Sequence, residues 1–222
     1  MIEITNEDNM ELMARYEDNY FDLAIVDPPY GINYIGTSNT TKIKNKNKLK
    51  DYKHNKSKSN WDNKRPSIKY FKELKRVSKN QIILGGNYFA DLLPAKRGWI
   101  YWDKKITNSN CKNFSDGELA WTSFDCILRK FTYDWIGFGY LNNPQKQKKI
   151  HPTEKPIQLY EWLLMNYAKE NDKILDTHLG SGSIAIACHN LDYDLTACEI
   201  DKDYFNSAMK RLKQHQAQLT IF

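Results

Sequence analysis

The sequence predicts an α/β fold with a mostly parallel sheet and helices on both of its faces. Apolar runs of strand length alternate along the chain with segments of helical periodicity, and an acid or a glycine follows several of these runs directly. The 222 residues suffice for one domain with a full core. A hydrophobic content of 41% and an aromatic content of 13% favour a folded chain over a disordered one.

Residues 22–124 supply four predicted strands and one helix. The apolar run at 22–26 stops at Asp27-Pro-Pro, as expected of a buried strand ended by proline. Pro66 suits a first helical position, and a helix at 66–78 is predicted because apolar residues recur there at helical spacing, namely Ile68, Phe71, Leu74 and Val77. The QIIL run at 81–84 is a strand ended by Gly85-Gly86, and aromatic-rich runs at 98–102 and 119–124 are further strands.

The second half repeats the alternation more regularly. A helix is predicted at 156–168 with Pro156 at its start, followed by a strand at 173–176 and a helix at 183–190. A strand at 194–198 ends at Glu199, and a helix at 201–216 is expected to be capped by Asp201. A parallel sheet binds ligands at the carboxyl ends of its strands, which is where Asp27, Gly85, Gly180 and Glu199 fall.

Two regions interrupt the single predicted domain, and one of them holds the positive charge. The net charge is +6, but residues 42–58 contain eight lysines and one aspartate, whereas the rest of the chain has 25 basic against 26 acidic residues. This basic loop belongs to a stretch at about 36–60 without periodicity. A second irregular, aromatic insert spans about 104–149.

Several classes of protein are disfavoured by composition. No run approaches the ~18 apolar residues of a membrane span, and the polar start MIEITNEDNM does not resemble a secretory signal. Neither the four cysteines nor the five histidines show metal-site spacing, so no metal is expected and a reduced, cytoplasmic setting is predicted. The cysteines are interpreted as small buried hydrophobes.

Three short motifs could carry chemistry. In the first, Asp27-Pro28-Pro29-Tyr30, two prolines stiffen a turn that offers an acid, carbonyl acceptors and a flat ring, which suits a planar molecule with an exocyclic amine. The alternative is that these residues only end the strand and that the acid has no function. The presence of Tyr30 in a D-P-P-Y sequence after a buried strand favours function over this alternative. The set predicts recognition of an amine-bearing ring.

The second motif is a glycine turn, Gly180-Ser181-Gly182-Ser183, between the strand ending at Asp176 and the following helix. Such a turn lets a ligand approach the backbone at a helix N-terminus, and an acid such as Glu199 at the next strand end commonly binds ribose hydroxyls. The pattern predicts a nucleoside-containing cofactor but does not separate NAD from S-adenosylmethionine.

The third motif, His151-Pro-Thr-Glu-Lys155-Pro156, stands at the entry of a predicted helix. Thr153 and Lys155 could meet an anionic group such as a carboxylate there. A plain helix start with proline explains the same residues, and spacing alone does not decide between the two.

Taken in order, these motifs resemble one known enzyme family. D-P-P-Y, the pair Trp61-Asp62, then Gly85-Gly86-Asn87, H-P-T-E-K-P and D-x-x-x-G-S-G resemble the N6-adenine/N4-cytosine DNA methyltransferases in their beta arrangement, where the catalytic motif precedes the glycine motif. The resemblance covers about residues 22–203. One departure is Thr177-His178, where the family commonly has Pro-Phe, so the cofactor pocket is expected to differ in detail.

The resemblance implies a Rossmann-like fold and S-adenosylmethionine as methyl donor. Asp27 and the Pro28 carbonyl would accept hydrogen bonds from the target amine, and Tyr30 would stack on a base flipped out of duplex DNA. The cofactor would be held by Asp27, Thr153, Lys155, Asp176, Gly180, Ser181, Gly182, Ser183 and Glu199.

The family allows more than one activity. Asp at the head of the P-P-Y motif favours adenine N6, as in a restriction-modification methyltransferase, while cytosine N4 stays open. An NAD-dependent oxidoreductase would leave D-P-P-Y and H-P-T-E-K-P unexplained. A non-catalytic DNA-binding relative is disfavoured by the intact Asp27.

Partners are predicted from the charged loop, the insert and the tail. The aromatic insert at about 104–149 is expected to take part in recognition of the DNA sequence. The loop is expected to contact DNA phosphates through Lys42, Lys44, Lys46, Lys48, Lys50, Lys53, Lys56 and Lys58, against the alternative of a solvated loop in an AT-biased sequence. The tail resembles peptides that dock on the bacterial sliding clamp, with Gln218, Leu219, Ile221 and Phe222 as anchors, although packing on its own domain is equally favoured. Dimerisation is common in the family, so a homodimer is also possible.

Overall fold

A single sheet organises the chain in the computed structural model, which describes residues 1–33, 62–105, 115–135, 150–151 and 153–218. Its strand order is β1-β8-β7-β2-β3-β5-β4-β6. The strands are β1 (Ile2–Thr5), β2 (Phe21–Val26), β3 (Ser78–Leu84), β4 (Trp99–Asp103), β5 (Gly117–Thr122), β6 (Arg129–Thr132), β7 (Lys173–Asp176) and β8 (Asp194–Cys198).

The sheet is mostly parallel, as predicted. Five neighbouring strand pairs run parallel, and β5 runs antiparallel to both of its neighbours, β3 and β4. Because β5 is reversed, its first residues lie at the same edge as the carboxyl end of β3, where Leu84 pairs with Ala120. This reversal brings residues of the predicted insert to the edge that holds the sequence motifs.

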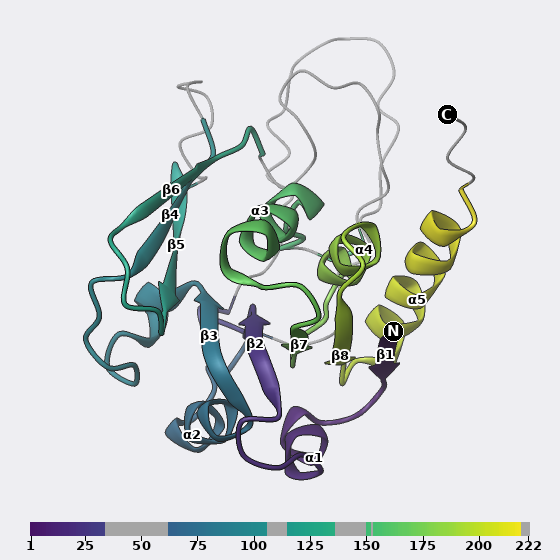
Figure 1. The fold of residues 1–222 in the computed structure, drawn as a ribbon, viewed down its shortest axis with the longest axis horizontal. Helices are drawn as coiled ribbons and strands as arrows, with labels where there is room; N and C mark the ends of the chain where they lie inside the picture. Colours follow the sequence, from purple (N-terminus) through teal and green to yellow (C-terminus); the bar gives the residue numbers. More distant parts are fainter. Residues whose placement is uncertain (34–61, 106–114, 136–149, 152, 219–222) are drawn as a thin grey trace, which may run out of the picture.

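Helices cover both faces of the sheet, which confirms the predicted class (Figure 1). They are α1 (Asn9–Ala14), α2 (Ile68–Val77), α3 (Ile157–Tyr167), α4 (Ser183–Asn190) and α5 (Lys202–Gln216), with a short 3-10 turn η1 (Gly86–Phe89) after β3. Helices α3, α4 and α5 contribute to one core and α1 and α2 to the other.

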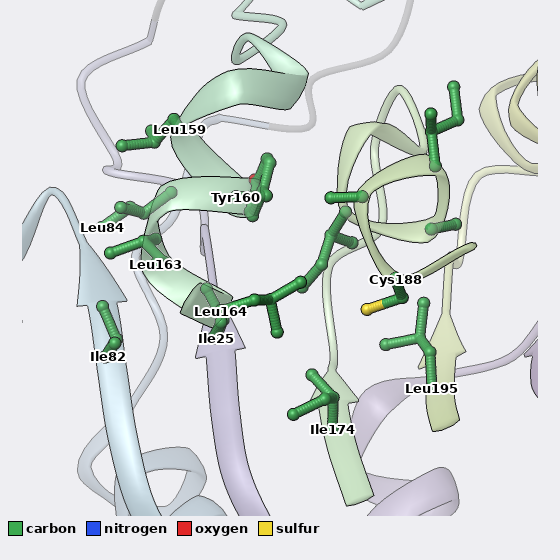
Figure 2. Close-up of a cluster of buried hydrophobic side chains, with 14 of the residues drawn as sticks. Ile25, Ile82, Leu84, Leu159, Tyr160, Leu163, Leu164, Ile174, Cys188 and Leu195 are labelled. Carbon is green, nitrogen blue, oxygen red and sulfur yellow. The ribbon is translucent and has the colours of Figure 1, made fainter. Parts of the chain in front are cut away.

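Strand β2 shows how the sequence specifies the two cores. Leu23 and Ile25 point into the cluster under α3 and α4, whereas Ala24 and Val26 point into the cluster under α1 and α2. A parallel strand buried on both faces is apolar without alternation, which is the pattern of residues 23–26. Figure 2 shows the first cluster, where Leu163 and Leu164 of α3 approach Ile25.

Most predicted elements are confirmed, with three bounded as predicted: β7, α4 and β8. Asp201 caps α5 by accepting hydrogen bonds from the backbone N–H groups of Asp203 and Tyr204. Three details were wrong. Pro66 lies before Ser67, the N-cap of α2, and not at the first position of the helix. Ile68 is 44% exposed and is not part of the buried stripe of α2, in which Tyr70 takes a place. Pro156 caps α3 and does not stand inside it.

The sequence-based prediction missed the first two elements and the last edge strand. Strand β1 is only four residues long and half exposed, and β6 has three exposed residues and one buried residue, Phe131. Helix α1 is a six-residue helix capped by Asp8. Within the predicted insert, the structure describes β5 and β6, so this region is at least in part an extension of the sheet.

Within the described residues, the structure also shows the state of the cysteines and allows a search for membrane-spanning helices and metal sites. Cys188 and Cys198 are free and buried in the two cores, as predicted for small hydrophobes, and Cys126 is free and half-buried. None of the helices in the described ranges has the length and apolar content needed to cross a bilayer. Within the same ranges, His, Cys, Asp and Glu side chains form no group of three or more suited to holding a metal ion.

Candidate active site

Four neighbouring parallel strands bring the sequence motifs to one edge of the sheet. Strands β8, β7, β2 and β3 lie side by side, and Glu199, Asp176, Asp27 and Gly85 stand at or directly after their carboxyl ends. From β2 the chain continues to β3 on one side, and later returns through α3 to β7 on the other. The ends of β2 and β7 therefore flank the point where the order reverses, the usual ligand crevice of such sheets.

Asp27 lies at this crevice with both carboxylate oxygens engaged. Its Oδ1 accepts a hydrogen bond of 2.8 Å from the Tyr30 hydroxyl, and its Oδ2 lies 2.8 Å from the ammonium Nζ of Lys155. The turn that carries Asp27 is braced from behind, because Asp62 accepts a hydrogen bond from the backbone N–H of Gly31 at 2.8 Å. The carboxylate is thus fixed in position.

The Tyr30 ring depends on the glycine at the end of β3. Gly85 has a φ of +66°, and a Cβ there would overlap the Tyr30 ring. The ring stacks on Tyr88 of η1 with 4.5 Å between centroids and an interplanar angle of 12°. The Lys155 ammonium lies 5.4 Å from the Tyr30 centroid. Tyr30 is therefore held by aromatic and cationic neighbours next to Asp27.

Lys155 joins the first motif to the third. Its side chain is 4% exposed and contacts two carboxylates, Asp27 at 2.8 Å and Glu118 Oε2 at 3.4 Å. These two acids raise the pKa of Lys155 against the opposing effect of burial, so that it is a permanent cation. In this structure Lys155 forms an ion pair with Asp27, the acid of the D-P-P-Y turn. A contact between Lys155 and an anionic group of the cofactor remains a proposal.

The glycine turn is closed by Glu199. Glu199 Oε2 accepts a hydrogen bond of 2.8 Å from the N–H of Gly180, and its Oε1 accepts one of 2.9 Å from the N–H of Asp201. Gly182 has a φ of +76°, and a Cβ there would stand 3.1 Å from the Cβ of Ala208 on α5. The turn therefore adopts a backbone that favours glycine and packs tightly against the last helix.

Buried acids concentrate around this turn. Asp176 is 1% exposed, and burial raises its pKa to about 8, with further contributions from the charges of Asp27 and Glu199. Burial also raises the pKa of Glu199. Such a set of desolvated carboxylates is stabilised in its ionised form by a cationic ligand.

The third motif is tied to the glycine turn through Arg211 of α5. Its guanidinium donates to the Ser181 carbonyl and the Ser183 hydroxyl, each at 3.0 Å, and lies 3.1 Å from Glu154. The Ser183 hydroxyl in turn donates to the Lys155 carbonyl at 2.8 Å. The hydroxyl groups of Ser181 and Ser183 are buried and 3.1 Å apart, so they brace the turn from inside.

Thr153 lies on the same segment, where its hydroxyl pairs with His151 Nδ1 at 3.2 Å. The His151 ring packs edge-on against Tyr204 at 4.5 Å between centroids, and a Cβ added at Gly180 would lie 3.8 Å from the His151 ring. The segment thus lies directly beside the glycine turn. A cofactor contact of Thr153 stays a prediction.

The Thr177-His178 pair, which departs from the Pro-Phe common in the resembled family, forms a polar chain. The Thr177 hydroxyl lies 2.7 Å from the Tyr70 hydroxyl and 2.9 Å from His178 Nδ1, and His178 Nε2 lies 3.1 Å from the Asn9 amide. Burial lowers the pKa of His178 to about 3, so the ring is neutral at physiological pH. The Asn9 amide can then donate to Nε2, while Nδ1–H donates to Thr177.

Sequence reasoning missed Glu118, Tyr88 and Arg211. Glu118 lies in the reversed strand β5, and strand direction has no signature in its short sequence. Tyr88 follows the predicted Gly-Gly-Asn by one residue, so an aromatic residue after that turn was an available signal. Arg211 stands one turn after Ala208 on the face of α5 toward the glycine turn, a position that helical spacing could have indicated.

Two predicted contact regions fall outside the described residues. The eight lysines of the basic loop, between Lys42 and Lys58, all belong to residues 34–61, and Leu219, Ile221 and Phe222 belong to 219–222. Gln218 is described and exposed, and its N–H donates to the His215 carbonyl.

Comparison with known proteins identifies relatives over almost the whole chain. A family model of N6/N4 methyltransferases, described as DNA methylase, matches residues 121–210. Type II methyltransferase M.HpaI of Haemophilus parainfluenzae is 26% identical over 91% of this chain and 71% of its own length. Type II methyltransferase M2.DpnII of Streptococcus pneumoniae is 23% identical over 95% of this chain and 89% of its own.

Solved structures share the fold. M1.HpyAVI in complex with S-adenosylmethionine aligns with a TM-score of 0.59 at 22% identity, covering 96% of this chain and all of that one. The cytosine-N4-specific PvuII DNA methyltransferase aligns with a TM-score of 0.57 at 11% identity, covering all of this chain and 88% of that one. The predicted Rossmann-like methyltransferase fold is confirmed.

Sequence relatives, family model and fold agree with the order of the motifs along the chain. D-P-P-Y at the end of β2 precedes the glycine turn after β7, and the strand order places both at one crevice. The chain is therefore similar to the N6-adenine/N4-cytosine DNA methyltransferases in the order of its motifs, in sequence over residues 121–210 and in fold.

Proposed function

We propose that this protein transfers a methyl group from S-adenosylmethionine to the exocyclic N6 of an adenine in duplex DNA, at a specific site. The observation that carries the proposal is the position of Asp27. Its carboxylate lies on a stiff turn, within hydrogen-bond distance of Tyr30 and Lys155, at the crevice that also holds Asp176 and Glu199. One edge of the sheet therefore holds the Asp27 acceptor, the Tyr30 ring and the glycine turn.

The residues of the glycine turn fit S-adenosylmethionine. This molecule carries a positively charged sulfonium and an ammonium, and the turn is surrounded by the buried carboxyl groups of Asp176 and Glu199. Glu199, at the end of β8, is also in the position from which an acid accepts hydrogen bonds from ribose hydroxyls. We assign Asp27, Asp176, Gly180, Ser181, Gly182, Ser183 and Glu199, with Thr153 and Lys155 of the neighbouring segment, to cofactor binding.

The chemical role of the protein is positioning and electrostatics. An exocyclic amine is a poor nucleophile because its lone pair is delocalised into the ring. Acceptance of the amine hydrogens by Asp27 and the Pro28 carbonyl favours a pyramidal nitrogen with a localised lone pair. The cofactor supplies a methyl group whose carbon–sulfur bond breaks, with its electrons left on sulfur, as the carbon–nitrogen bond forms. The nitrogen then releases one proton to water.

The target base must leave the duplex to reach Asp27, at a cost of a few kcal/mol. We assign Tyr30 to stacking on that base, because its ring stands three residues from the acceptor on the same turn. Tyr88, which stacks on one face of Tyr30 and is 38% exposed, would either support this ring from behind or be displaced by the base.

Cytosine N4 is the second candidate, because both amines suit the same acceptors and PvuII methyltransferase, which aligns over the whole of this chain, is cytosine-N4-specific. The two are separated by methylating duplex DNA of random sequence and detecting modified positions base by base. N6-methyladenine within a recurrent sequence supports the proposal. N4-methylcytosine alone overturns the choice of base, and no methylated base overturns the proposed function.

We further infer that the basic loop contacts DNA phosphates. Eight lysines within 42–58, set shortly after the D-P-P-Y turn in sequence, would add affinity that is independent of sequence and weakened by salt. Replacement of Lys46, Lys48 and Lys50 by glutamine should flatten the dependence of DNA affinity on salt. An unchanged slope would identify the loop as a solvated segment.

The tail is a separate proposal. A pull-down with the bacterial sliding clamp, with the whole chain and with a chain ending at Ala217, tests docking through Gln218, Leu219, Ile221 and Phe222. Binding that needs the tail supports docking, whereas no binding or tail-independent binding contradicts it. A homodimer is tested by light scattering, where the mass of a single chain, 26.2 kDa, would argue against it.

As its relatives are type II methyltransferases, we propose that the protein serves restriction-modification, acting in the cytoplasm where DNA is its substrate. The same methylation assay tests the alternative that this protein is a non-catalytic, DNA-binding relative.

A further inference from the structure

Glu118 is a carboxylate of the active-site edge whose second oxygen accepts no hydrogen bond within the described part of the chain. It lies at the start of β5, where the reversed direction of the strand brings it to the carboxyl edge of β3. Its Oε1 pairs with Lys104 Nζ at 2.5 Å. Its Oε2 is buried and accepts no hydrogen bond from any described residue, although Lys155 Nζ is 3.4 Å away.

Lys155 therefore stands between two carboxylates and favours one of them. It lies 2.8 Å from Asp27 Oδ2 and 3.4 Å from Glu118 Oε2. Its side chain is 4% exposed, so water does not compete with these partners as it would at the surface. With Lys104 included, the cluster holds two acids and two ammonium groups and is balanced in charge.

This arrangement gives each Asp27 oxygen one donor. Tyr30 donates to its Oδ1 and Lys155 to its Oδ2. Each oxygen can accept a second hydrogen bond, but an oxygen already paired with an ammonium is a weaker acceptor for the hydrogens of a target amine. Withdrawal of Lys155 would therefore strengthen Asp27 as an acceptor. Lys155 can withdraw without losing its counter-charge, because Glu118 Oε2 lies 3.4 Å from its Nζ and accepts no hydrogen bond from the described residues.

We propose that Glu118 is a positioning residue that receives the Lys155 ammonium when the target base binds, and so frees Asp27 Oδ2 for the amine. This inference rests on the proposed function. Moving the ammonium away from Asp27 leaves a carboxylate with higher electron density, which is a stronger acceptor for the amine hydrogens. Charge inside the site is conserved during the exchange, since the cation passes from one acid to the other and the arriving base is neutral.

The test is Glu118→Gln, which keeps the volume of the side chain and removes its charge. Lys155 should then stay on Asp27, so that kcat for methyl transfer falls about tenfold or more, the scale of one charge in a desolvated site. The dissociation constant of S-adenosylmethionine and that of duplex DNA should remain within about twofold, because neither ligand is bound through Glu118. Glu118→Asp, which restores a carboxylate, should recover part of kcat.

Asp103→Asn is the matched control. Asp103 lies on the neighbouring strand β4 and pairs with Lys130 at 2.6 Å outside this cluster, so its neutralisation should leave kcat unchanged. A Glu118→Gln enzyme with wild-type kcat overturns the inference while leaving the proposed function intact. A fall in kcat that Asp103→Asn reproduces, or that Glu118→Asp does not relieve, also overturns it. Absence of methyl transfer by the wild-type protein overturns the proposed function itself.

Discussion

Lys155 and Asp27, separated by 128 residues in sequence, form a buried ion pair in which Nζ lies 2.8 Å from Oδ2. The pair links the D-P-P-Y turn to the segment that enters α3. It follows from the parallel order of the sheet, since the chain leaves β2 on one side and returns through α3 to β7 on the other. The two most specific motifs of the sequence therefore meet at one acid.

Loss of the Lys155 charge should be costly for folding. In Lys155→Met, Asp27 and Glu118 remain buried without their shared cation, and breaking such a buried pair costs about 3–5 kcal/mol. The free energy of unfolding, measured by urea denaturation, should fall by an amount of this order. Lys79→Met is the matched control: Lys79 pairs with Asp22 at 2.6 Å but is 55% exposed, so the change should be much smaller. Equal effects of the two variants would contradict the account of a desolvated pair.

Gly85 should be intolerant of a side chain. In Gly85→Ala, the new Cβ would overlap the Tyr30 ring, and the left-handed backbone adds roughly 1–2 kcal/mol of strain. We expect a lower melting temperature together with a loss of methyl transfer per folded molecule. Asn171→Ala places alanine in a similar backbone conformation, with φ of 67°, on an exposed residue far in sequence from Tyr30. Asn171→Ala should lower stability but leave kcat unchanged. A loss of kcat in Asn171→Ala equal to that in Gly85→Ala would contradict the role of Tyr30.

Arg211 should strengthen cofactor binding without contacting the DNA itself. Arg211→Met removes the bonds to Ser181 and Ser183 and the pair with Glu154, so the glycine turn loses a charged brace worth about 1.5–3 kcal/mol per bond. Calorimetry should show S-adenosylmethionine binding weakened roughly tenfold or more. Arg76→Met removes a comparable network near α1, on the other face of the sheet, and should leave the dissociation constant unchanged. Unaltered binding by Arg211→Met would contradict this role.

Asp176 should make cofactor binding depend on pH. Its pKa is raised to about 8, so near pH 7 the carboxyl group is largely protonated, and a cationic ligand that favours the carboxylate must displace the proton. Affinity for S-adenosylmethionine should therefore rise from pH 6 to pH 7.5, with proton release detectable by calorimetry in buffers of different ionisation enthalpy. Asp176→Asn keeps the acceptor for the His178 N–H and should abolish the release. Uptake of protons by the wild-type protein on cofactor binding would contradict this prediction.

The sequence indicated the regular parts of the fold because those parts are specified locally. Strands such as β7 and β8 are buried apolar runs between an acid or glycine and a turn, and α4 begins directly after Gly182. Short edge elements were missed since β1 and β6 bury few side chains and have little periodicity. Their stability comes from pairing with β8 and β4, which is a tertiary contact.

The site was predictable to the extent that it consists of strand ends. Asp27, Asp176 and Glu199 each follow a recognisable buried strand, and parallel order alone brings them to one edge. The link between Lys155 and Glu118 was not predictable, because it depends on the direction of β5 and on which face Glu118 takes. Arg211 likewise acts across helices rather than within a motif.

The central claim is that Asp27 directs methyl transfer to adenine N6. It is tested most directly by incubating the wild-type protein and Asp27→Ala with duplex DNA and S-adenosylmethionine labelled in its methyl group, followed by nucleoside mass spectrometry. The account predicts labelled N6-methyladenine from the wild-type protein and a loss of at least about a hundredfold in Asp27→Ala, measured at saturating S-adenosylmethionine. N6-methyladenine formed by Asp27→Ala at the wild-type rate, or label found only in cytosine, would contradict it.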